Sequence, residues 1–304
     1  MISCVITTYK RPASEVKRAI DSACNQTLQN KEIIVVNDAP DETGIRDEIG
    51  DLLKEYNVTV KYIVHDRNLG ACAARNTGIE NASGEYVAFL DDDDEWDNDY
   101  LQAVQEKIEL TNADIIACDY RLVKSYKTFT AYKKHLPEGN IYQQMIFEDY
   151  VGPTSTVVVR RSKLIEAGMF DVNMPARQEY DMWLRVCKNG GTVAYIKVPK
   201  VSIYREGKDS ITNRGTNHVR GTEMVLQKLL SDPSLASYYE KIKYYQYYEA
   251  GYFSMSRKQY QLARKYFKLA LRSKMHTIKL YVFIIFSYFP WTYEFVRCIY
   301  RLTR

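Results

Sequence analysis

The chain opens with a regular alternation of short apolar runs and stretches of helical spacing, and this alternation restricts the fold more than any other feature. Four apolar runs predict strands: Ile2–Thr7, Glu32–Asn37, Val58–Val64 and Tyr86–Leu90. Three intervening segments predict helices: Ala13–Gln26, Ile45–Tyr56 and Ala71–Asn81. Continuous apolar strands separated by helices are typical of a mostly parallel sheet that helices cover on both faces. The sequence therefore predicts an α/β fold, in which ligands bind beyond the carboxyl ends of the strands.

The rest of the chain divides into a less regular part and an all-helical part. Up to about residue 215 the pattern predicts further helices and strands: Tyr100–Leu110, Ile115–Cys118, Thr156–Arg160, Arg177–Lys188 and Thr192–Val198. We interpret the polar segment Lys124–Gly139 as a surface loop. From residue 216 onward the signals are helical: Glu223–Leu230, Leu235–Ser256, Gln259–Ser273 and the end of the chain. We therefore expect two domains, residues 1–215 and residues 216–304.

Charge is unevenly distributed along the 304 residues, although the formal net charge is only +4. Residues 241–304 contain 13 Lys or Arg and 2 Asp or Glu, a net charge of +11, whereas residues 1–240 carry −7. The N-terminus shows no secretory signal, and the six scattered cysteines form no CxxC pair, which favours a reducing cytosol. The longest apolar stretch, Ile278–Phe289, would span ~18 Å as a helix, short of the ~30 Å hydrocarbon core. We expect a cytoplasmic protein without a transmembrane helix.

Four consecutive carboxylates, Asp91 to Asp94, follow the fourth predicted strand directly. Such a cluster repels itself unless a cation is present, and oxygen-rich sites suit hard divalent ions such as Mg²⁺ or Mn²⁺. The alternative is a solvated acidic turn in which one Asp caps the next helix. The position at a strand end in the fourth strand–helix unit favours the metal site.

Two further segments carry candidate functional residues. In Asn68–Gly78, Gly70 allows an unusual backbone angle at a strand-to-helix turn, and Arg75 suits a phosphate or carboxylate. The alternative for Arg75 is a structural pair with the Asp cluster. In Gln178–Arg185, Glu179 shares a helix face with apolar residues, which raises a carboxyl pKa and suits a general base. The alternative for Glu179 is a charge stabilised by the helix N-terminus. Asp181 and Arg185 are expected to form an ordinary surface pair.

Together these segments resemble family 2 glycosyltransferases of the GT-A fold, of the type that builds bacterial surface polysaccharides. Five motifs carry the resemblance, in the family's order: Val5–Pro12, near a first-strand motif ending Thr-Tyr-Asn-Arg; Val35–Asp38, with the second-strand aspartate; Asn68–Gly78, matching Asn-x-Gly-x-x-x-Ala-Arg-Asn-x-Gly; Phe89–Asp94, matching Asp-x-Asp; and Ser162–Asp171 followed by Glu179–Arg185, on the acceptor side. The resemblance implies a Rossmann-like catalytic domain and spans residues 1 to about 215.

The resemblance also implies a role for each matching residue. It places nucleotide-sugar contacts at these positions: Thr8, Tyr9, Asp38, Asn68, Arg75, Asp91 and Asp92. It makes Asp93, assisted by Asp91, the ligand of Mn²⁺ or Mg²⁺, and Glu179 the catalytic base, with Asp181 and Trp183 on the acceptor side. The chain departs from the family where Gln178-Glu179 replaces the usual Glu-Asp, where Lys10 replaces Asn, and where Tyr204–Ser210 lacks a His that serves some members as a metal ligand.

The implied reaction is an inverting transfer from a nucleotide-sugar to a hydroxyl of a lipid-linked saccharide. A UDP-sugar is expected, because Asp38 can accept the imide N–H of uracil while Tyr9 stacks on the ring. Two alternatives are a nucleotidyltransferase, which would want a Gly-rich loop that Thr7–Arg11 lacks, and a non-catalytic scaffold, which would have a decayed metal site. A nucleic-acid partner is not expected, since aliphatic residues interrupt the basic tail.

The tail itself predicts contact with a membrane surface. An aromatic and aliphatic stripe and an arginine stripe share the last segment: Trp291, Phe295, Cys298, Ile299 and Leu302, and Arg297, Arg301 and Arg304. With the preceding Leu280–Phe289 they are typical of an interfacial helix on an anionic inner membrane face, into which we expect Phe283, Phe286 and Trp291 to insert. The alternative is a helix packed in a homodimer or against the body. In the preceding helical pair, the spacing of Tyr247, Gly251, Ala263, Phe267 and Ala270 predicts a packed hairpin.

Overall fold

The computed structural model describes residues 1–40, 44–56, 58–124, 127–131, 138–205 and 216–293. The chain forms two compact units. The first holds all the described strands and helices α1 to α7, and the second holds α8 to α11. Ile146–Glu148 and Met174–Arg177 belong to the helical unit, which the sequence did not reveal because segments of three and four residues carry no periodicity. The boundary predicted near Gly215 lies outside the described residues and stays a prediction.

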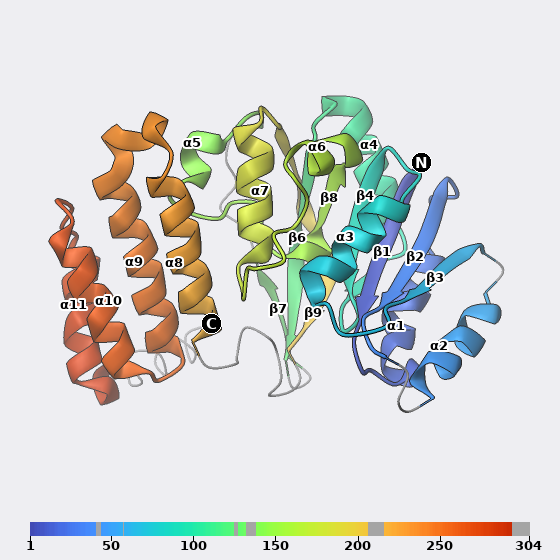
Figure 1. The fold of residues 1–304 in the computed structure, drawn as a ribbon, viewed down its shortest axis with the longest axis horizontal. Helices are drawn as coiled ribbons and strands as arrows, with labels where there is room; N and C mark the ends of the chain where they lie inside the picture. The colour runs from blue at the N-terminus through green and yellow to red at the C-terminus, as the bar shows by residue number, and fades with distance from the viewer. Residues whose placement is uncertain (41–43, 57, 125–126, 132–137, 206–215, 294–304) are drawn as a thin grey trace. The chain divides into compact units, whose positions relative to one another are not determined.

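The first unit is built on a mixed sheet (Figure 1), to which the described residues contribute nine strands. Its strands are β1 (Ile2–Thr8), β2 (Lys31–Asn37), β3 (Val60–Val64), β4 (Tyr86–Asp91), β5 (Glu95–Trp96), β6 (Ile115–Lys124), β7 (Lys127–Ala131), β8 (Val157–Arg160) and β9 (Val193–Tyr204). Their order is β3-β2-β1-β4-β8-β6-β9-β5, with β7 paired to β6. The strands β3, β2, β1 and β4 are parallel, as predicted, whereas β8 runs antiparallel to both β4 and β6.

Helices cover both faces of this sheet. They are α1 (Ala13–Cys24), α2 (Ile45–Lys54), α3 (Ala71–Asn81), α4 (Tyr100–Thr111), α5 (Tyr142–Met145), α6 (Arg161–Glu166) and α7 (Gln178–Lys188). Alternate strand residues point to opposite faces, so Cys4 and Ile6 join α1, α2 and α4 in one core. On the other face, Val5 meets α3 and Phe89 meets Trp183 of α7. The apolar runs in the sequence are continuous because both faces of these strands are buried.

The register of the parallel strands brings the predicted motifs to one edge of the sheet. Thr8 at the end of β1 pairs with Asn37 at the end of β2, and Thr7 pairs with Asp91 at the end of β4. The segments that follow these strands therefore begin side by side, as expected for the carboxyl edge of a parallel sheet.

The polar segment Lys124–Gly139 is not simply a loop, which corrects the sequence prediction. Strand β6 extends to Lys124, and β7 returns antiparallel beside it, with Arg121 paired to Thr130 and Val123 to Thr128. The side chains of residues 127–130 are exposed. A solvent-facing strand needs no apolar alternation, so its composition does not distinguish it from a loop.

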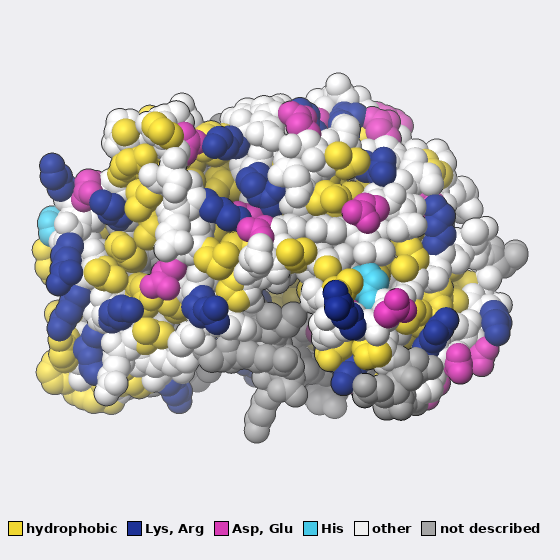
Figure 2. Space-filling model, in the orientation of Figure 1, with side chains coloured by type: hydrophobic (Ala, Val, Ile, Leu, Met, Phe, Trp, Pro, Cys, Tyr) yellow, Lys and Arg dark blue, Asp and Glu magenta, His cyan; other side chains and the backbone are white. Residues whose placement is uncertain are grey.

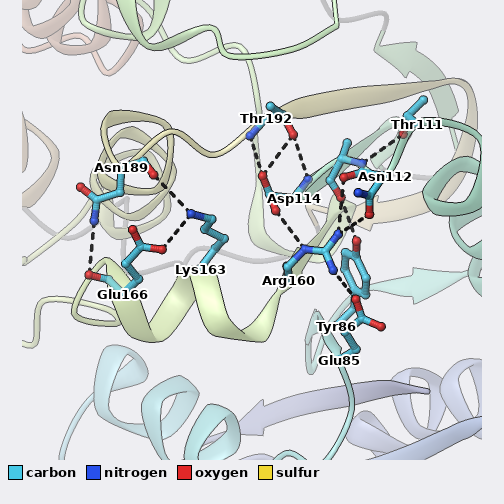
Figure 3. Close-up of polar contacts among 11 residues, drawn as sticks. Glu85, Tyr86, Thr111, Asn112, Asp114, Arg160, Lys163, Glu166, Asn189 and Thr192 are labelled. Atoms are coloured by element: carbon cyan, nitrogen blue, oxygen red, sulfur yellow. Dashed lines mark hydrogen bonds and ion pairs between the residues drawn. The ribbon is translucent and has the colours of Figure 1, made fainter.

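The opposite edge of the sheet is held by a polar network centred on Arg160 (Figure 3). The Arg160 guanidinium donates to Asp114 at 2.9 Å, to the side-chain oxygen of Asn112 at 2.8 Å and to Glu85. The other carboxylate oxygen of Asp114 accepts from the amide and hydroxyl of Thr192, at 3.0 and 3.1 Å. The network joins the amino ends of β4, β6 and β9 to the carboxyl end of β8, so it stabilises the sheet away from the edge where the motifs gather.

The helical unit contains α8 (Asn217–Leu230), a 3₁₀ helix (Pro233–Tyr238), α9 (Tyr239–Ser256), α10 (Tyr260–Arg272) and α11 (Ile278–Tyr288). Helices α9 and α10 form the predicted hairpin, and they approach so closely that a Cβ on Gly251 would stand 2.5 Å from the Phe267 ring. Within the described part of the chain, no helix combines the length and apolar character needed to cross a bilayer. The predicted stripe residues from 295 onward lie outside the described residues.

Candidate active site

The four carboxylates after β4 have different environments. Asp91 pairs with Arg75 at 2.7 Å, and Arg11 reaches both Asp92 at 3.5 Å and Asp93 at 3.3 Å. Asp94 is buried, and it accepts hydrogen bonds from the Ser155 hydroxyl at 2.6 Å and the Tyr204 amide at 3.2 Å. Asp94 joins β4 to the loop before β8 and to β9, which agrees with its absence from the predicted metal ligands, Asp93 and Asp91.

Burial makes this cluster hard to ionise. It raises the pKa of Asp92 to about 7, although Arg11 attracts the charged form and partly offsets the effect. Burial also raises the pKa of Asp93, and the neighbouring Asp91 adds to the shift. Both shifts show that negative charge on this buried cluster is unfavourable, although Arg11 lies beside it.

These residues fit a divalent cation shared with a diphosphate. A hard cation favours carboxylate oxygens, and its charge would reverse the unfavourable ionisation of Asp92 and Asp93. Within the parts of the chain that the structure describes, no three His, Cys, Asp or Glu side chains gather into a ready-made metal cage. One or two carboxylates completed by phosphate oxygens and water are the usual arrangement for Mg²⁺ in such sites.

Arg75 connects the acidic cluster to α7. Its buried guanidinium donates to Asp91 at 2.7 Å and to the Gln178 side chain at 3.2 Å, and it lies 5.6 Å from the centre of the Phe170 ring. Asn76, one residue further along α3, exchanges two hydrogen bonds with the backbone of Phe170, at 2.8 and 2.9 Å. Arg75 and Asn76 therefore hold neighbouring elements in position. In this conformation Arg75 makes the structural pair with the Asp cluster that was the alternative to a phosphate contact.

Glu179 lies in the first turn of α7, next to Gln178, and is half-buried. Burial raises the pKa of the Glu179 carboxyl; Arg75 opposes the shift, and Asp149 and Asp91 add to it. The structure thus brings Glu179 into the electrostatic environment of Arg75 and Asp91. A carboxyl that is costly to ionise, next to a charged cluster, is the setting of many general bases.

Asp38 holds the loop that precedes α3. Its carboxylate accepts from the Leu69 amide at 2.9 Å and the Gly70 amide at 2.7 Å, and it lies 2.8 Å from Nδ1 of His65. The other ring nitrogen of His65 lies 2.9 Å from the Thr77 hydroxyl. The resemblance implied only a base contact for Asp38. This positioning role depends on a contact with His65 that spans 27 positions and leaves no local pattern, although His65 directly follows a predicted strand.

The remaining predicted nucleotide contacts differ in exposure. Tyr9 is 41% exposed just beyond β1, Asn68 is exposed, and Thr8 is buried. Lys10 adopts a positive φ of 53°, and its ammonium lies 5.6 Å from the centre of the Tyr9 ring. Tyr9 and Asn68 are therefore open to a ligand without rearrangement.

The two residues assigned to the acceptor side, Asp181 and Trp183, are buried in this structure, and that assignment stays a prediction. Trp183 is fully buried between Phe89 and Phe170 and donates to the Gly152 carbonyl at 2.9 Å. Asp181 is also buried and pairs with Arg185 at 2.8 Å, so this pair is not the surface pair predicted. The helix face that carries them packs inward, which leaves neither side chain exposed to an acceptor in this conformation.

Sequence reasoning missed the cations beside the acidic cluster. Arg11 was seen only as part of a motif, and Arg18 lies on α1. Arg18 donates to the Asp93 carbonyl at 2.5 Å, and its guanidinium lies 3.7 Å from the centre of the Tyr204 ring. Arg11 lies two residues before α1 and Arg18 lies within it, so no helical spacing in the sequence relates the two side chains.

The amino-acid sequence is similar to a known protein family and to individual members of known function class. Residues 3–169 match the protein family described as Glycosyl transferase family 2. The chain is 28% identical over 228 residues to the putative teichuronic acid biosynthesis glycosyltransferase TuaG of Bacillus subtilis, with 74% of this chain and 87% of TuaG covered. It is 34% identical over 148 residues to the glycosyltransferase GlyA of Streptococcus pneumoniae, covering 48% of this chain but only 19% of GlyA. The chain thus spans a small part of some relatives.

Solved structures resemble the fold at low sequence identity. S. aureus TarS 1-349 in complex with UDP-GlcNAc superposes with a TM-score of 0.67 at 14% identity, covering 88% of this chain and 81% of that one. The mannosyltransferase PcManGT from Pyrobaculum calidifontis, in complex with GDP-Man and Mn²⁺, gives 0.61 at 14% identity, covering 93% and 78%. At this identity the likeness establishes the fold.

Proposed function

Because the chain belongs to glycosyl transferase family 2 and has the GT-A fold expected from its motifs, we propose that it transfers a sugar from a nucleotide-sugar to a saccharide hydroxyl with inversion. One observation carries the proposal: Arg75 joins Asp91 to Gln178, the neighbour of Glu179, at the sheet edge where the motifs meet. One base and one cation site suit a single displacement, whereas a glycosidase needs two carboxylates flanking the bond.

The residues have distinct tasks in this reaction. Glu179 accepts the proton of the acceptor hydroxyl, and its raised pKa makes it a stronger base than an ordinary carboxylate. Asp93 and Asp91 hold Mn²⁺ or Mg²⁺, which when bound offsets negative charge on the leaving diphosphate. Arg75 keeps Asp91 and Gln178 in fixed positions, so the base and the cation site stay aligned.

A UDP-sugar is the proposed donor. The exposed Tyr9 ring is available to stack on a base, and the Asp38 carboxylate keeps oxygen lone pairs for an imide N–H beyond its three present contacts. The complex of TarS with UDP-GlcNAc supports this choice, whereas the GDP-Man complex of PcManGT shows that the fold also accepts guanine.

The proposed acceptor is a lipid-linked saccharide in surface polysaccharide biosynthesis, at the inner face of the cell membrane. The similarity to TuaG and to the putative colanic acid biosynthesis glycosyl transferase WcaA of Escherichia coli supports it. The +11 charge of residues 241–304 supports peripheral attachment to an anionic membrane.

A donor screen tests the proposal. Nucleoside diphosphate release is measured for a panel of nucleotide-sugars with Mn²⁺ or Mg²⁺, for the unaltered protein and Glu179→Gln. We expect cation-dependent release from a UDP-sugar that falls in Glu179→Gln. Release that persists in excess chelator contradicts the cation site, and tighter binding of GDP than UDP by calorimetry contradicts the donor. A folded protein that turns over no donor favours the scaffold alternative.

A further inference from the structure

Helix α11 is apolar on both of its faces, which is unusual for a helix at a protein surface. Its inner face packs into the helical unit, with Leu280 buried and Phe283 in ring contact with Tyr248, Tyr252 and Phe267. Phe286 packs beside Phe283 at 5.9 Å between ring centres. Phe283 and Phe286 are therefore partly buried against the core of the helical unit, which does not fit the expectation that they insert into a membrane.

The outer face of α11 presents a second apolar stripe. Ile278 is 85% exposed, Ile285 56% and Phe289 54%. The stripe recurs at helical spacing through the following exposed residues: Ile278, Tyr281, Val282, Ile285, Tyr288 and Phe289. Trp291, just beyond, is 71% exposed. We call these seven side chains the outer stripe. A contiguous exposed patch of this kind marks an interaction surface.

The surroundings of the outer stripe are basic. From Arg257 to Tyr293 the sequence contains eight Lys or Arg and no Asp or Glu. Arg264 donates to the Ser287 carbonyl at 2.9 Å, and its guanidinium lies 4.9 Å from the centre of the Tyr288 ring. A hollow of about 790 Å³ is lined by Lys258, Arg264 and Lys265 and reaches Pro290, next to the stripe. Figure 2 shows hydrophobic and basic side chains together along the edge where Figure 1 draws α11.

We propose that the outer stripe is the surface by which the protein binds anionic lipid bilayers, with α11 lying in the plane of the interface. The inference rests on the proposed peripheral attachment and assigns it to particular residues. At 11 residues α11 is about 16 Å long, too short to span but suited to lie flat. Tyr281, Tyr288 and Trp291 have the amphipathic rings that favour the headgroup region, and the basic side chains match anionic headgroups.

A second copy of the chain fits this surface less well. In a two-fold dimer the same patch meets itself, so the basic groups around each outer stripe would face one another. Without acidic residues between Arg257 and Tyr293, such an interface has no complementary charge there, whereas an anionic bilayer supplies it.

Vesicle flotation of the full-length protein tests the surface. Phosphatidylcholine vesicles with and without phosphatidylglycerol are compared for the unaltered protein, for Ile285→Asp, and for the control Leu110→Asp on α4, whose side chain is 79% exposed. We expect binding to the anionic vesicles, a loss of about tenfold or more in Ile285→Asp, and no loss in the control. Thermal unfolding and solution turnover of donor by both variants verify their folding.

Three outcomes overturn the proposal, and a fourth separates it from the proposed function. Equal flotation of Ile285→Asp and the unaltered protein removes the stripe from membrane binding. A concentration-dependent dimer that Ile285→Asp dissociates, with no vesicle binding, assigns the stripe to self-association. A monomer that binds no vesicles shows that the stripe serves neither purpose. If no donor is turned over but Ile285→Asp still loses vesicle binding, the proposed function fails and the membrane surface stands.

Discussion

At the scale of single residues, Glu179 combines a chemical task with a cost to the fold. Burial makes ionisation of its half-buried carboxyl unfavourable, the charges of Asp149 and Asp91 add to this effect, and Arg75 offsets it only in part. The same environment that makes the carboxylate a stronger base makes the folded protein less stable when the group is charged.

Glu179→Gln should lose turnover by roughly 10²–10⁴-fold, the usual share of general acid–base catalysis. The substitution keeps the side-chain volume and removes the proton acceptor, so donor binding measured by calorimetry should change little. Near-normal turnover in this variant would mean that the base lies elsewhere, and the burial of Asp181 makes that residue a poor substitute.

The stability of Glu179→Gln should exceed that of the unaltered protein at neutral pH. The pKa of Glu179 is raised in the folded state, so below about pH 4 both states carry the neutral acid and the two proteins differ least. As the pH rises, the unfolded chain ionises first and the folded carboxyl resists, so the unaltered protein loses stability until the pH exceeds the raised pKa. Urea unfolding at several pH values measures the difference in free energy of unfolding between Glu179→Gln and the unaltered protein. A difference that shrinks with rising pH would contradict the prediction.

Asp93→Asn should remove the response to Mn²⁺. With UDP present, Mn²⁺ should raise the unfolding temperature of the unaltered protein, because a ligand that binds only the folded state stabilises it. The control Asp51→Asn changes an exposed carboxylate on α2 and should keep the full response. Turnover should be lost in Asp93→Asn alone; a Mn²⁺ response equal to that of the control would exclude Asp93 as a ligand.

The sequence indicates where the site's carboxylates lie along the chain but not which of them are buried or paired. The strand-end position of Asp91 and the alternative pairing of Arg75 with the Asp cluster agree with the structure, whereas the roles assigned to these residues and to Glu179 stay predictions. Asp94 is more deeply buried than Asp91–Asp93, and Trp183 lies on the inward face of α7 in the core. These differences arise from tertiary contacts, such as that between Ser155 and Asp94, which span 61 positions and leave no local pattern.

At the scale of elements, the packing of α3 on β1 explains the last glycine of the Asn68–Gly78 motif. A Cβ added to Gly78 would stand 2.3 Å from one methyl of Val5 and 2.9 Å from the other. The helix that carries Arg75 toward Asp91 can therefore approach the sheet only because this position lacks a side chain. The close packing of the helix is a condition for the site.

Gly78→Ala should destabilise the protein by about 1–3 kcal/mol, the usual cost of overpacking a core. The control Gly50→Ala on α2 meets only Tyr62, at 3.9 Å, and should be neutral or slightly stabilising because Ala favours helices. Adding Val5→Ala to Gly78→Ala should recover part of the loss. Urea unfolding measures all four proteins, and equal stability of the two glycine variants would contradict the packing argument.

Element prediction succeeded where burial imposes a pattern. The range Ala71–Asn81 of α3 agrees with its prediction, and the first four strands agree within two residues at each end, because both faces of this sheet exclude water. The exposed β7 and the extension of β6 to Lys124 escaped prediction, since polar side chains satisfy a solvent-facing strand as well as a loop.

At the scale of the whole molecule, the unequal distribution of charge predicts how salt affects membrane binding. Residues 1–240 carry −7 and residues 241–304 carry +11, so an anionic bilayer attracts one part of the chain and repels the other. Each basic group near an anionic surface contributes about 1 kcal/mol, and this attraction weakens as the Debye length falls from ~10 Å at 0.1 M salt to ~3 Å at 1 M. The free energy gained by burying the apolar outer stripe does not weaken with salt in this way.

Vesicle binding should therefore decline with salt to a residual level instead of to zero. Lys258→Glu with Lys265→Glu should lower binding to anionic vesicles at low salt and converge with the unaltered protein at high salt, because both substitutions change the lining of the basic hollow and leave the outer stripe intact. Ile285→Asp should lower binding at every salt concentration, since it alters the apolar contact. Flotation across a salt series distinguishes the two effects. If the unaltered protein does not bind at high salt, the outer stripe contributes nothing to binding. If binding does not change with salt, the basic groups contribute nothing.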